Sequence, residues 1–222
     1  NDGEQLSDII QRAGGYKKGA YVYGAALFRE AALSKEELYA QLNYADTVNY
    51  IVSNIGKAGG NIGAGALNLL VEELRSKNYS GRVIADFNLK NLRDNPSLNI
   101  TLADNDRLVI PELQKVVYMF GDFKNSSNFT YDPTQSIKEY IDLAGGLKDS
   151  AYSEIIIIDP DGRTQTYNKR YFLTSNSVDI YPGSIIYAPR DIGKLSSLSY
   201  VAAVSPVLSS LALTLASLNS IK

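Results

Sequence analysis

The sequence predicts an α+β protein that contains one small unit twice and ends in a long uncharged segment. A helix that closes on Ala-Gly-Gly and leads into a strand occurs over residues 6–28 and again over residues 137–158. Each copy ends with an apolar strand that is closed by a proline, Pro111 in the first and Pro189 in the second. Residues 195–221 carry no charged side chain. Together these patterns indicate two related units followed by an apolar helix.

The two short helices have the apolar spacing of an amphipathic helix, in which every third or fourth residue faces the core. This spacing is made by Leu6, Ile9, Ile10 and Ala13 in the first copy and by Ile137, Tyr140, Ile141 and Ala144 in the second. The glycine pairs that follow supply the left-handed backbone that commonly ends a helix. We therefore predict structural turns at Gly14, Gly15, Gly145 and Gly146.

Each copy continues as a strand, over residues 20–28 in the first and 154–158 in the second. The second copy adds a β-hairpin, because the Asp-Pro-Asp-Gly sequence at 159–162 favours a turn and a strand pattern follows it at 163–167. The second copy also opens with a strand at 115–123. The equivalent strand of the first copy would lie before the start of the sequence. We therefore expect the chain to be a piece of a longer protein.

The first copy is the longer one because residues 34–77 are inserted into it. Helical spacing is present on both sides of a glycine-rich break at 56–65. It is made by Leu38, Leu42, Ala45, Val48, Ile51 and Val52 before the break and by Leu67, Leu70, Val71 and Leu74 after it. We predict a helical hairpin here. The resulting division is a first unit at 1–114, a second unit at 115–190 and a C-terminal helix at 191–222.

The uncharged tail has two different faces on a helical wheel. The apolar face is formed by Val201, Val204, Val207, Leu208, Leu211, Leu215 and Leu218, and the small, weakly polar face includes Ser199, Ser209, Ser210 and Ser217. As a helix the stretch reaches about 40 Å, which exceeds a hydrocarbon core of about 30 Å. We predict an amphipathic membrane helix whose apolar face meets lipid and whose serines face a pore or neighbouring helices. The alternatives are a shorter helix that begins at Ser205-Pro206, and a helix packed on its own domain or on a partner.

Composition excludes many function classes. The chain has 222 residues, and 22 basic against 24 acidic side chains give a net charge of −2, which argues against a nucleic-acid partner. Histidine and cysteine are both absent, which removes histidine general bases, thiol nucleophiles and nearly all zinc or copper sites. Only carboxylate chemistry and oxygen-ligated ions remain open by composition. Because the motifs that could supply them have plainer interpretations, we predict no enzymatic activity, no catalytic residues, no metal and no cofactor.

Three motifs invite a chemical interpretation, and each has a plainer one. The glycine cluster at 56–65 lacks the spacing of a phosphate-binding loop and is predicted to be an interhelical loop. The pattern Asp159-x-Asp161-Gly162 resembles the start of a calcium loop without its later ligands, so we predict a turn. A glycosidase-like carboxylate pair would need the two inserted helices to face each other, and solvated helix faces are the favoured interpretation. The carboxylates concerned are Glu36, Glu37, Glu72 and Glu73.

The order of these motifs resembles a known family. The paired Ala-Gly-Gly helix ends, the closing sequences Asp-Arg-Leu-Val-Ile-Pro at 106–111 and Pro-Gly-Ser-Ile-Ile-Tyr-Ala-Pro at 182–189, and the opening strand at 116–123 are similar to those of SLBB (soluble ligand-binding β-grasp) domains. Together with the helical insert and the uncharged C-terminal helix, they resemble the capsule-export branch of bacterial outer-membrane polysaccharide export (OPX) proteins. Ser184 stands where that family commonly has aspartate.

The resemblance implies two β-grasp repeats, of which the first carries the insertion, and a C-terminal membrane helix. It also implies a homo-oligomeric ring in the periplasm and outer membrane of a Gram-negative bacterium, with α-helices that form a pore. The partners would be a polysaccharide chain, outer-membrane lipid, and an inner-membrane polysaccharide co-polymerase or ABC exporter. The expected function is passive export of capsule-type polysaccharide. The alternatives are a soluble periplasmic glycan-binding or scaffold module without a pore and, as an outsider, a carboxylate-dependent polysaccharide-cleaving enzyme.

Overall fold

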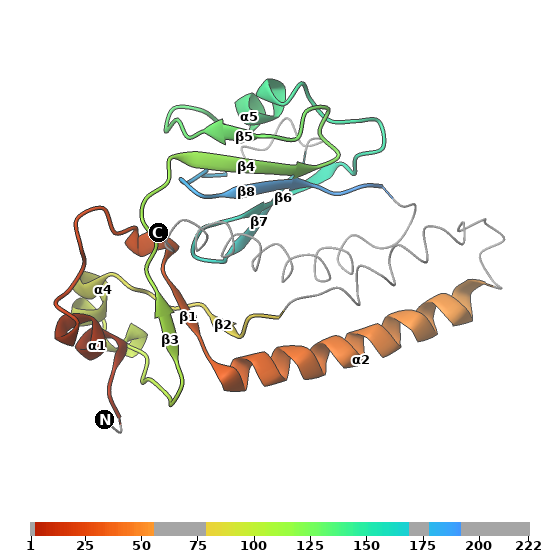
Figure 1. The fold of residues 1–222 in the computed structure, drawn as a ribbon. Helices are drawn as coiled ribbons and strands as arrows, with labels where there is room; N and C mark the ends of the chain where they lie inside the picture. Colours follow the sequence, from red (N-terminus) through yellow and green to blue (C-terminus); the bar gives the residue numbers. More distant parts are fainter. Residues whose placement is uncertain (1–2, 56–78, 169–177, 192–222) are drawn as a thin grey trace.

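The computed structural model describes residues 3–55, 79–168 and 178–191. Within these ranges the chain has two β-sheets and four α-helices, which confirms the predicted α+β class (Figure 1). No helix in the described ranges combines the length and hydrophobicity that a membrane crossing requires. The glycine-rich break, the second inserted helix and the predicted C-terminal helix at 191–222 lie outside these ranges, except for Asp191.

The second unit is built on a five-stranded sheet. Its strands are β4 (Val116–Gly121), β5 (Asn128–Thr130), β6 (Glu154–Ile158), β7 (Thr164–Asn168) and β8 (Ile185–Ala188). Their order across the sheet is β5-β4-β8-β6-β7, and the central pair β4 and β8 is parallel while every other pair is antiparallel. The chain therefore enters and leaves this unit along two neighbouring strands, and β5 and β7 form the two edges.

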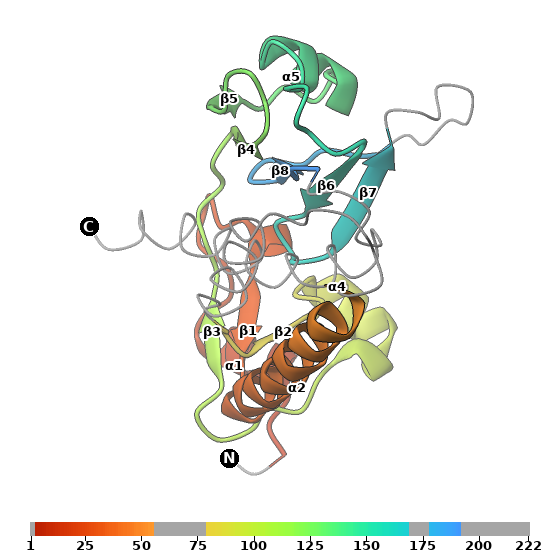
Figure 2. The ribbon, with the colours of Figure 1, turned by 90° about the vertical axis from the view of Figure 1, so that its right-hand side faces the viewer.

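Helix α5 (Ile137–Leu143) packs across one face of this sheet (Figure 2). It begins with a capping box in which the Ser136 backbone N–H donates to the Glu139 carboxylate at 2.6 Å. Apolar residues on the helix pack against the strand residues that point the same way. The resulting core contains Val117, Met119, Phe123, Ile137, Tyr140, Ile141, Ala144, Ile155, Ile157, Ile180, Ile186 and Ala188.

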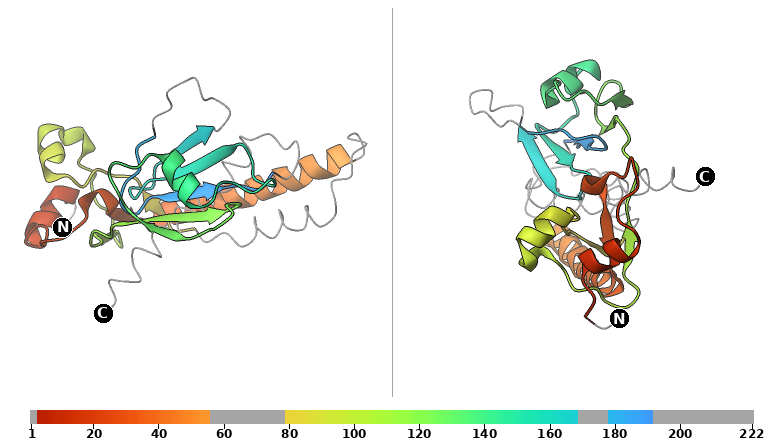
Figure 3. Two further views of the ribbon diagram at one scale, coloured as in Figure 1. Left: turned by 90° about the horizontal axis from the view of Figure 1, so that it is seen from above. Right: turned by 90° about the vertical axis from the view of Figure 1, so that its left-hand side faces the viewer.

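The first unit is built on a three-stranded antiparallel sheet of order β2-β1-β3. Its strands are β1 (Ala26–Phe28), β2 (Arg82–Val83) and β3 (Arg107–Val109). Helices α1 (Leu6–Arg12) and α4 (Leu89–Asp94) lie together on one side of this sheet (Figure 3) and share its core. The buried members of that core are Leu6, Ile10, Ala25, Leu27, Phe87 and Leu92.

The strand predicted at residues 20–28 is shorter in the structure. A 3-10 turn at Val22–Gly24 interrupts it, so only residues 26–28 pair in the sheet. The Gly24 N–H donates to the Tyr21 carbonyl at 3.1 Å, and a Cβ at Gly24 would lie 2.7 Å from the Tyr21 ring. The chain therefore turns back on itself here, which places two tyrosines at the contact between the units rather than in a strand.

Helix α2 (Glu30–Ile55) is inserted between β1 and β2 and extends away from the sheet (Figure 1). The insertion was predicted to begin at residue 34, and the helix starts four residues earlier, directly after β1. The Glu36 carboxylate holds its base, because it accepts hydrogen bonds from the backbone N–H groups of Ser80 and Gly81 at 3.2 and 2.9 Å. Glu36 therefore helps to return the chain to β2.

The two units repeat the same local contacts. The order and directions of β2-β1-β3 match those of β7-β6-β8. After the first helix of each unit, the N–H of the second glycine donates to an isoleucine carbonyl at 2.9 Å, from Gly15 to Ile10 and from Gly146 to Ile141. The closing proline of each unit accepts a hydrogen bond of 2.7 or 2.8 Å from a tyrosine N–H. The resemblance between the two sequences is therefore matched by their hydrogen bonds.

Candidate functional site

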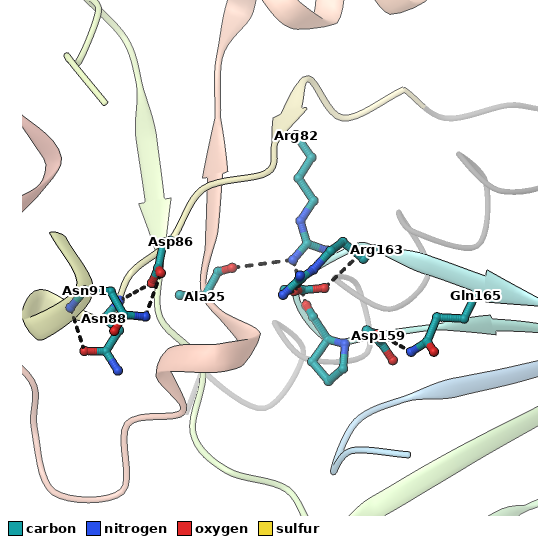
Figure 4. Close-up of polar contacts among 10 residues, drawn as sticks. Ala25, Arg82, Asp86, Asn88, Asn91, Asp159, Arg163 and Gln165 are labelled. Atoms are coloured by element: carbon teal, nitrogen blue, oxygen red, sulfur yellow. Dashed lines mark hydrogen bonds and ion pairs between the residues drawn. The ribbon is translucent and has the colours of Figure 1, made fainter. Parts of the chain in front are cut away.

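The two units meet where a turn of the second unit lies against strand β2 of the first. The turn at residues 159–162 joins β6 to β7. From β2, the Nη2 atom of Arg82 donates a hydrogen bond of 2.7 Å to the carbonyl oxygen of Pro160 and one of 3.4 Å to that of Ala25 (Figure 4). One guanidinium group thus bonds to both units. We call this contact, made by Arg82 with the turn at 159–162, the joint.

Gly162 lets the guanidinium lie against the turn. A Cβ at this position would lie 2.9 Å from Cζ of Arg82, closer than real Cβ atoms approach, and 3.0 Å from Nη1. The backbone of Gly162 also has a φ of +93°, in the region that favours glycine. Any side chain at this position would strain the turn and displace Arg82.

The guanidinium of Arg82 is incompletely paired. Its Nε and Nη1 atoms are buried and have no hydrogen-bond partner among the described residues. Burial lowers the pKa of Arg82 to about 10, and the nearby Asp161 charge opposes that shift. The group therefore stays protonated at neutral pH, and the joint contains a buried positive charge. Such a charge is costly to bury, which favours the one arrangement of the units in which its carbonyl partners are in reach.

Hydrogen bonds at the turn explain why Asp-Pro-Asp-Gly stands here. The Asp161 carboxylate accepts from the backbone N–H of Arg163 at 2.9 Å and is also paired with the guanidinium of that residue. The backbone closes with a hydrogen bond of 2.8 Å from the Gly162 N–H to the Asp159 carbonyl. The predicted turn at this motif is confirmed, and its two aspartates are part of the joint.

Asp159 is the most unusual carboxylate of the joint. It is only 4% exposed, its Oδ2 accepts 2.7 Å from the Nε2 of Gln165, and its Oδ1 is buried with no partner among the described residues. Burial raises its pKa to about 6, and the charges of Asp161 and Asp179 add to that shift, while the hydrogen bond from Gln165 and the charge of Arg163 oppose it. Asp159 therefore gains a proton far more readily in the folded chain than in the unfolded one.

This raised pKa predicts that Asp159 opposes folding at neutral pH. Protonated Asp159 stabilises the fold below about pH 4, and this stabilisation is lost as pH rises through about 6. The loss amounts to about 2 to 3 kcal/mol of unfolding free energy. We expect the unfolding free energy of Asp159→Asn minus that of wild type to be about 2 kcal/mol larger at pH 7.5 than at pH 4.5. Urea unfolding at both pH values measures this change.

A carboxylate with the opposite shift provides the control for that experiment. The Arg29 guanidinium lowers the pKa of Asp106 by hydrogen bonding to it. The stability that this ion pair gives to Asp106 is already present above the unfolded pKa of about 4 and is lost only at lower pH. The stability difference between Asp106→Asn and wild type should therefore stay nearly constant between about pH 4.5 and pH 7.5. Equal slopes for the two variants would contradict the environment described for Asp159.

Three tyrosines add an aromatic layer to the joint. The ring centroids of Tyr21 and Tyr23 are 6.2 Å apart, and Tyr23 lies 4.7 Å from Tyr181 of the second unit. The hydroxyl of Tyr21 is buried without a partner among the described residues. Burial is the main cause that raises the pKa of all three hydroxyl groups. They therefore stay neutral and pack as amphipathic rings across the contact between the units.

The first unit has an ion pair at the ends of two of its strands. The Arg29 guanidinium donates to the Asp106 carboxylate at 2.9 Å from Nε and at 2.6 Å from Nη2. The same carboxylate accepts a hydrogen bond of 2.9 Å from the backbone N–H of Ala103 and so closes the turn before β3. One aspartate thus serves both a turn and an ion pair.

The second unit has different residues at the equivalent places. Asp159 corresponds to Arg29, because each follows the strand that pairs with the last strand of its unit. Ser184 corresponds to Asp106, because its Oγ accepts a hydrogen bond of 3.0 Å from the backbone N–H of Tyr181 in the equivalent turn. The serine keeps the turn hydrogen bond and omits the charge. A second carboxylate beside Asp159 would lack the arginine that the first unit has.

A second candidate site is a pocket of about 490 Å³ beside the edge strand β5. Its lining is largely apolar, and Leu143 at the end of α5 is 51% exposed there. The amide oxygen of Gln135 is buried without a partner among the described residues. The lining residues are Phe129, Thr130, Tyr131, Asp132, Pro133, Gln135 and Leu143.

The structure describes only some of the residues that the sequence singled out. The four turn glycines have positive φ angles, of +91° and +79° at Gly14 and Gly15 and of +75° and +88° at Gly145 and Gly146. Glu36 is engaged with the backbone at the base of α2. Glu37 is exposed on the same helix. The other residues lie outside the described ranges. These are Glu72, Glu73, Ser199, Val201, Val204, Val207, Leu208, Ser209, Ser210, Leu211, Leu215, Ser217 and Leu218.

Neither the joint nor the pocket is evident from the sequence. Arg82 follows a segment without a clear pattern, and nothing local indicates that its partner is a turn of the other unit. The only signal in the sequence is the Asp-Pro-Asp-Gly motif. This motif is typical of an exposed turn, so it gives no indication that its first aspartate is buried. Comparison with known proteins adds no assignment, because no family model and no curated protein matches the chain.

Proposed function

We propose that the chain is a subunit of an outer-membrane polysaccharide export channel, in which two β-grasp units stack in a homo-oligomeric periplasmic ring. The observation that carries the proposal is the strand arrangement of the second unit. Its central parallel strands β4 and β8 are flanked by antiparallel partners, and α5 crosses one face. This arrangement supports a β-grasp fold, and the order of the last three strands and the helix recurs in the first unit.

The joint supports a stacked arrangement of the units. A buried guanidinium bonded to carbonyl groups of both units favours a single relative orientation. A ring built from several copies needs such a fixed orientation, because small differences between subunits would prevent closure. The joint would therefore be a structural element of the channel wall, and polysaccharide export would proceed without covalent chemistry.

The predicted C-terminal helix supplies the membrane part of this proposal. Its apolar face would meet lipid, and its serines would line a water-filled conduit that binds sugar weakly enough to let it pass. The inner-membrane partner would deliver the polysaccharide to the periplasmic end of the ring. The outer membrane and periplasm of a Gram-negative bacterium are the corresponding location.

The proposal predicts that charges on the two faces of the tail have opposite effects. We expect the full-length chain to float with liposomes and to form one large, discrete oligomer in detergent. The double variant Leu208→Glu and Leu211→Glu should stay in the soluble fraction, because each charge at the centre of a bilayer costs about 2.5 to 3.5 kcal/mol. The matched double variant Ser209→Glu and Ser210→Glu should still float, because its charges would face water. Flotation followed by sizing in detergent measures both properties.

Other outcomes would reject the export proposal. A wild-type chain that neither floats nor oligomerises would remove its basis. A specific observation then favours a soluble glycan-binding module, because the 490 Å³ pocket combines aromatic rings with polar groups. Saturable binding of a bacterial polysaccharide by that monomer would establish this second function.

A further inference from the structure

The exposed edge of the five-stranded sheet has the features of a site for an extended peptide. Strand β5 pairs with β4 on one side, and among the described residues no strand pairs with its other side, which forms the sheet edge. Ser127 accepts a hydrogen bond of 3.0 Å from β4, and Tyr131 donates one of 2.9 Å to the residue that precedes β4. Main-chain groups alternate in an antiparallel pair, so those of Asn128 and Thr130 point away from the sheet. Both residues are exposed.

The pocket lies on the face of the sheet that an added strand would share with Phe129. Phe129 is paired with Val117, and both side chains pack on the core beneath α5. Side chains that lie opposite each other in neighbouring strands point to the same face. A strand added along β5 would therefore direct the side chain opposite Phe129 toward the apolar pocket lined by Tyr131 and Leu143.

Charges at this edge indicate what would flank that apolar side chain. Asp132 lines the pocket. Hydrogen bonds from Ser136 lower the pKa of Glu139, and the negative charge of Asp132 opposes that shift, so the two carboxylates interact. Hydrogen bonds from Thr134 lower the pKa of Asp132, so this carboxylate is negative at neutral pH. A basic residue next to the apolar one would complement the acidic side of the pocket.

We propose that this edge binds an extended polypeptide segment by strand addition, with one large apolar side chain in the pocket and a lysine or arginine beside Asp132. Main-chain hydrogen bonds to Asn128 and Thr130 would supply affinity, and the pocket would supply specificity. The binding needs neither a membrane nor a polysaccharide. Its failure and the failure of the export proposal are therefore distinguishable.

A single substitution can remove an outward N–H without removing a bond of the sheet. Thr130→Pro eliminates the N–H that faces the incoming strand, and proline is tolerated on an edge strand at such a position. Thr130→Val keeps that N–H and the strand preference and removes only the hydroxyl group. Leu143→Ser removes one apolar wall of the pocket from an exposed position.

The test uses the immobilised full-length chain and a displayed library of random ten-residue peptides. We expect enriched peptides to share an apolar residue next to a lysine or arginine. A synthetic peptide of that sequence should bind wild type and Thr130→Val equally and should bind Thr130→Pro and Leu143→Ser about tenfold more weakly. Circular dichroism and thermal unfolding of each variant verify that the fold is intact.

Three results would overturn the proposal. Enrichment on Thr130→Pro equal to that on wild type would show that β5 is not the binding edge. Enriched peptides without a shared apolar residue would show that the pocket does not contribute to peptide recognition. A concentration-dependent dimer that Thr130→Pro abolishes, together with no peptide enrichment, would show that a second copy of the chain occupies the edge.

Discussion

Replacement of Gly121 by alanine is expected to destabilise the second unit by about 4 kcal/mol or more, which lowers Tm by about 8 to 16 °C. Gly121 ends β4 beside the parallel strand β8, and its φ is +96°. A Cβ there would lie 2.1 Å from the carbonyl oxygen of Ala188 and 2.9 Å from its carbonyl carbon. These are backbone atoms at the paired ends of two neighbouring strands, so no side-chain rotation relieves the contact. That carbonyl also accepts a hydrogen bond of 2.8 Å from the N–H of Asp122.

The control is a glycine with the same backbone conformation and no neighbour. Gly146 has a φ of +88°, and a Cβ there would have no atom within 4 Å. Gly146→Ala should therefore cost only the unfavourable backbone conformation, about 1 to 2 kcal/mol. Urea unfolding of the two variants separates the strain of the backbone from the collision with Ala188. Equal losses would show that the contact between β4 and β8 is looser than the structure indicates.

The elements that the sequence predicted well are those determined by neighbouring residues. Both Ala-Gly-Gly helices, the hairpin around the Asp-Pro-Asp-Gly turn and the proline-closed strands have local signals, and the structure contains them. The strand at 20–28 was predicted too long because its alternating tyrosines have the pattern of a strand. In the structure these rings contact the other unit, and the chain turns at Val22–Gly24 to place them there.

The candidate sites depend on contacts between distant residues. Arg82 meets Pro160 and Gly162 across the contact between the units, and no periodic pattern indicates that pairing. The pocket at β5 likewise requires Leu143 to come next to a strand that precedes it in the chain. A short exposed strand without strong alternation gives little indication of its place at a sheet edge. Composition limited the chemistry of the chain, and only the structure located where its charged groups are buried.

The two units have different charges at equivalent positions, and this difference predicts a second large effect on stability. Ser184 is fully buried, and in the equivalent place the first unit has Asp106 paired with Arg29. Asp159 stands where that arginine would be needed. Ser184→Asp would give the second unit the aspartate that the first unit has at this place, yet it would put a second carboxylate next to a buried one. We expect a loss of about 3 kcal/mol or more at pH 8, because a buried charge without a partner is severely destabilising.

The missing partner can be supplied in the same chain. The double variant Asp159→Arg and Ser184→Asp recreates the Arg29–Asp106 ion pair of the first unit within the second. A double-mutant cycle at pH 8 should therefore give a favourable coupling of about 2 kcal/mol or more, whereas residues that do not interact are additive within about 0.5 kcal/mol. Ser184→Asn is the uncharged control, since its amide oxygen can accept the hydrogen bond from Tyr181, and it should lose less stability than Ser184→Asp. If the cycle is additive, the two strand ends are not equivalent. A favourable coupling would instead show that the second unit can hold the same ion pair at the equivalent place.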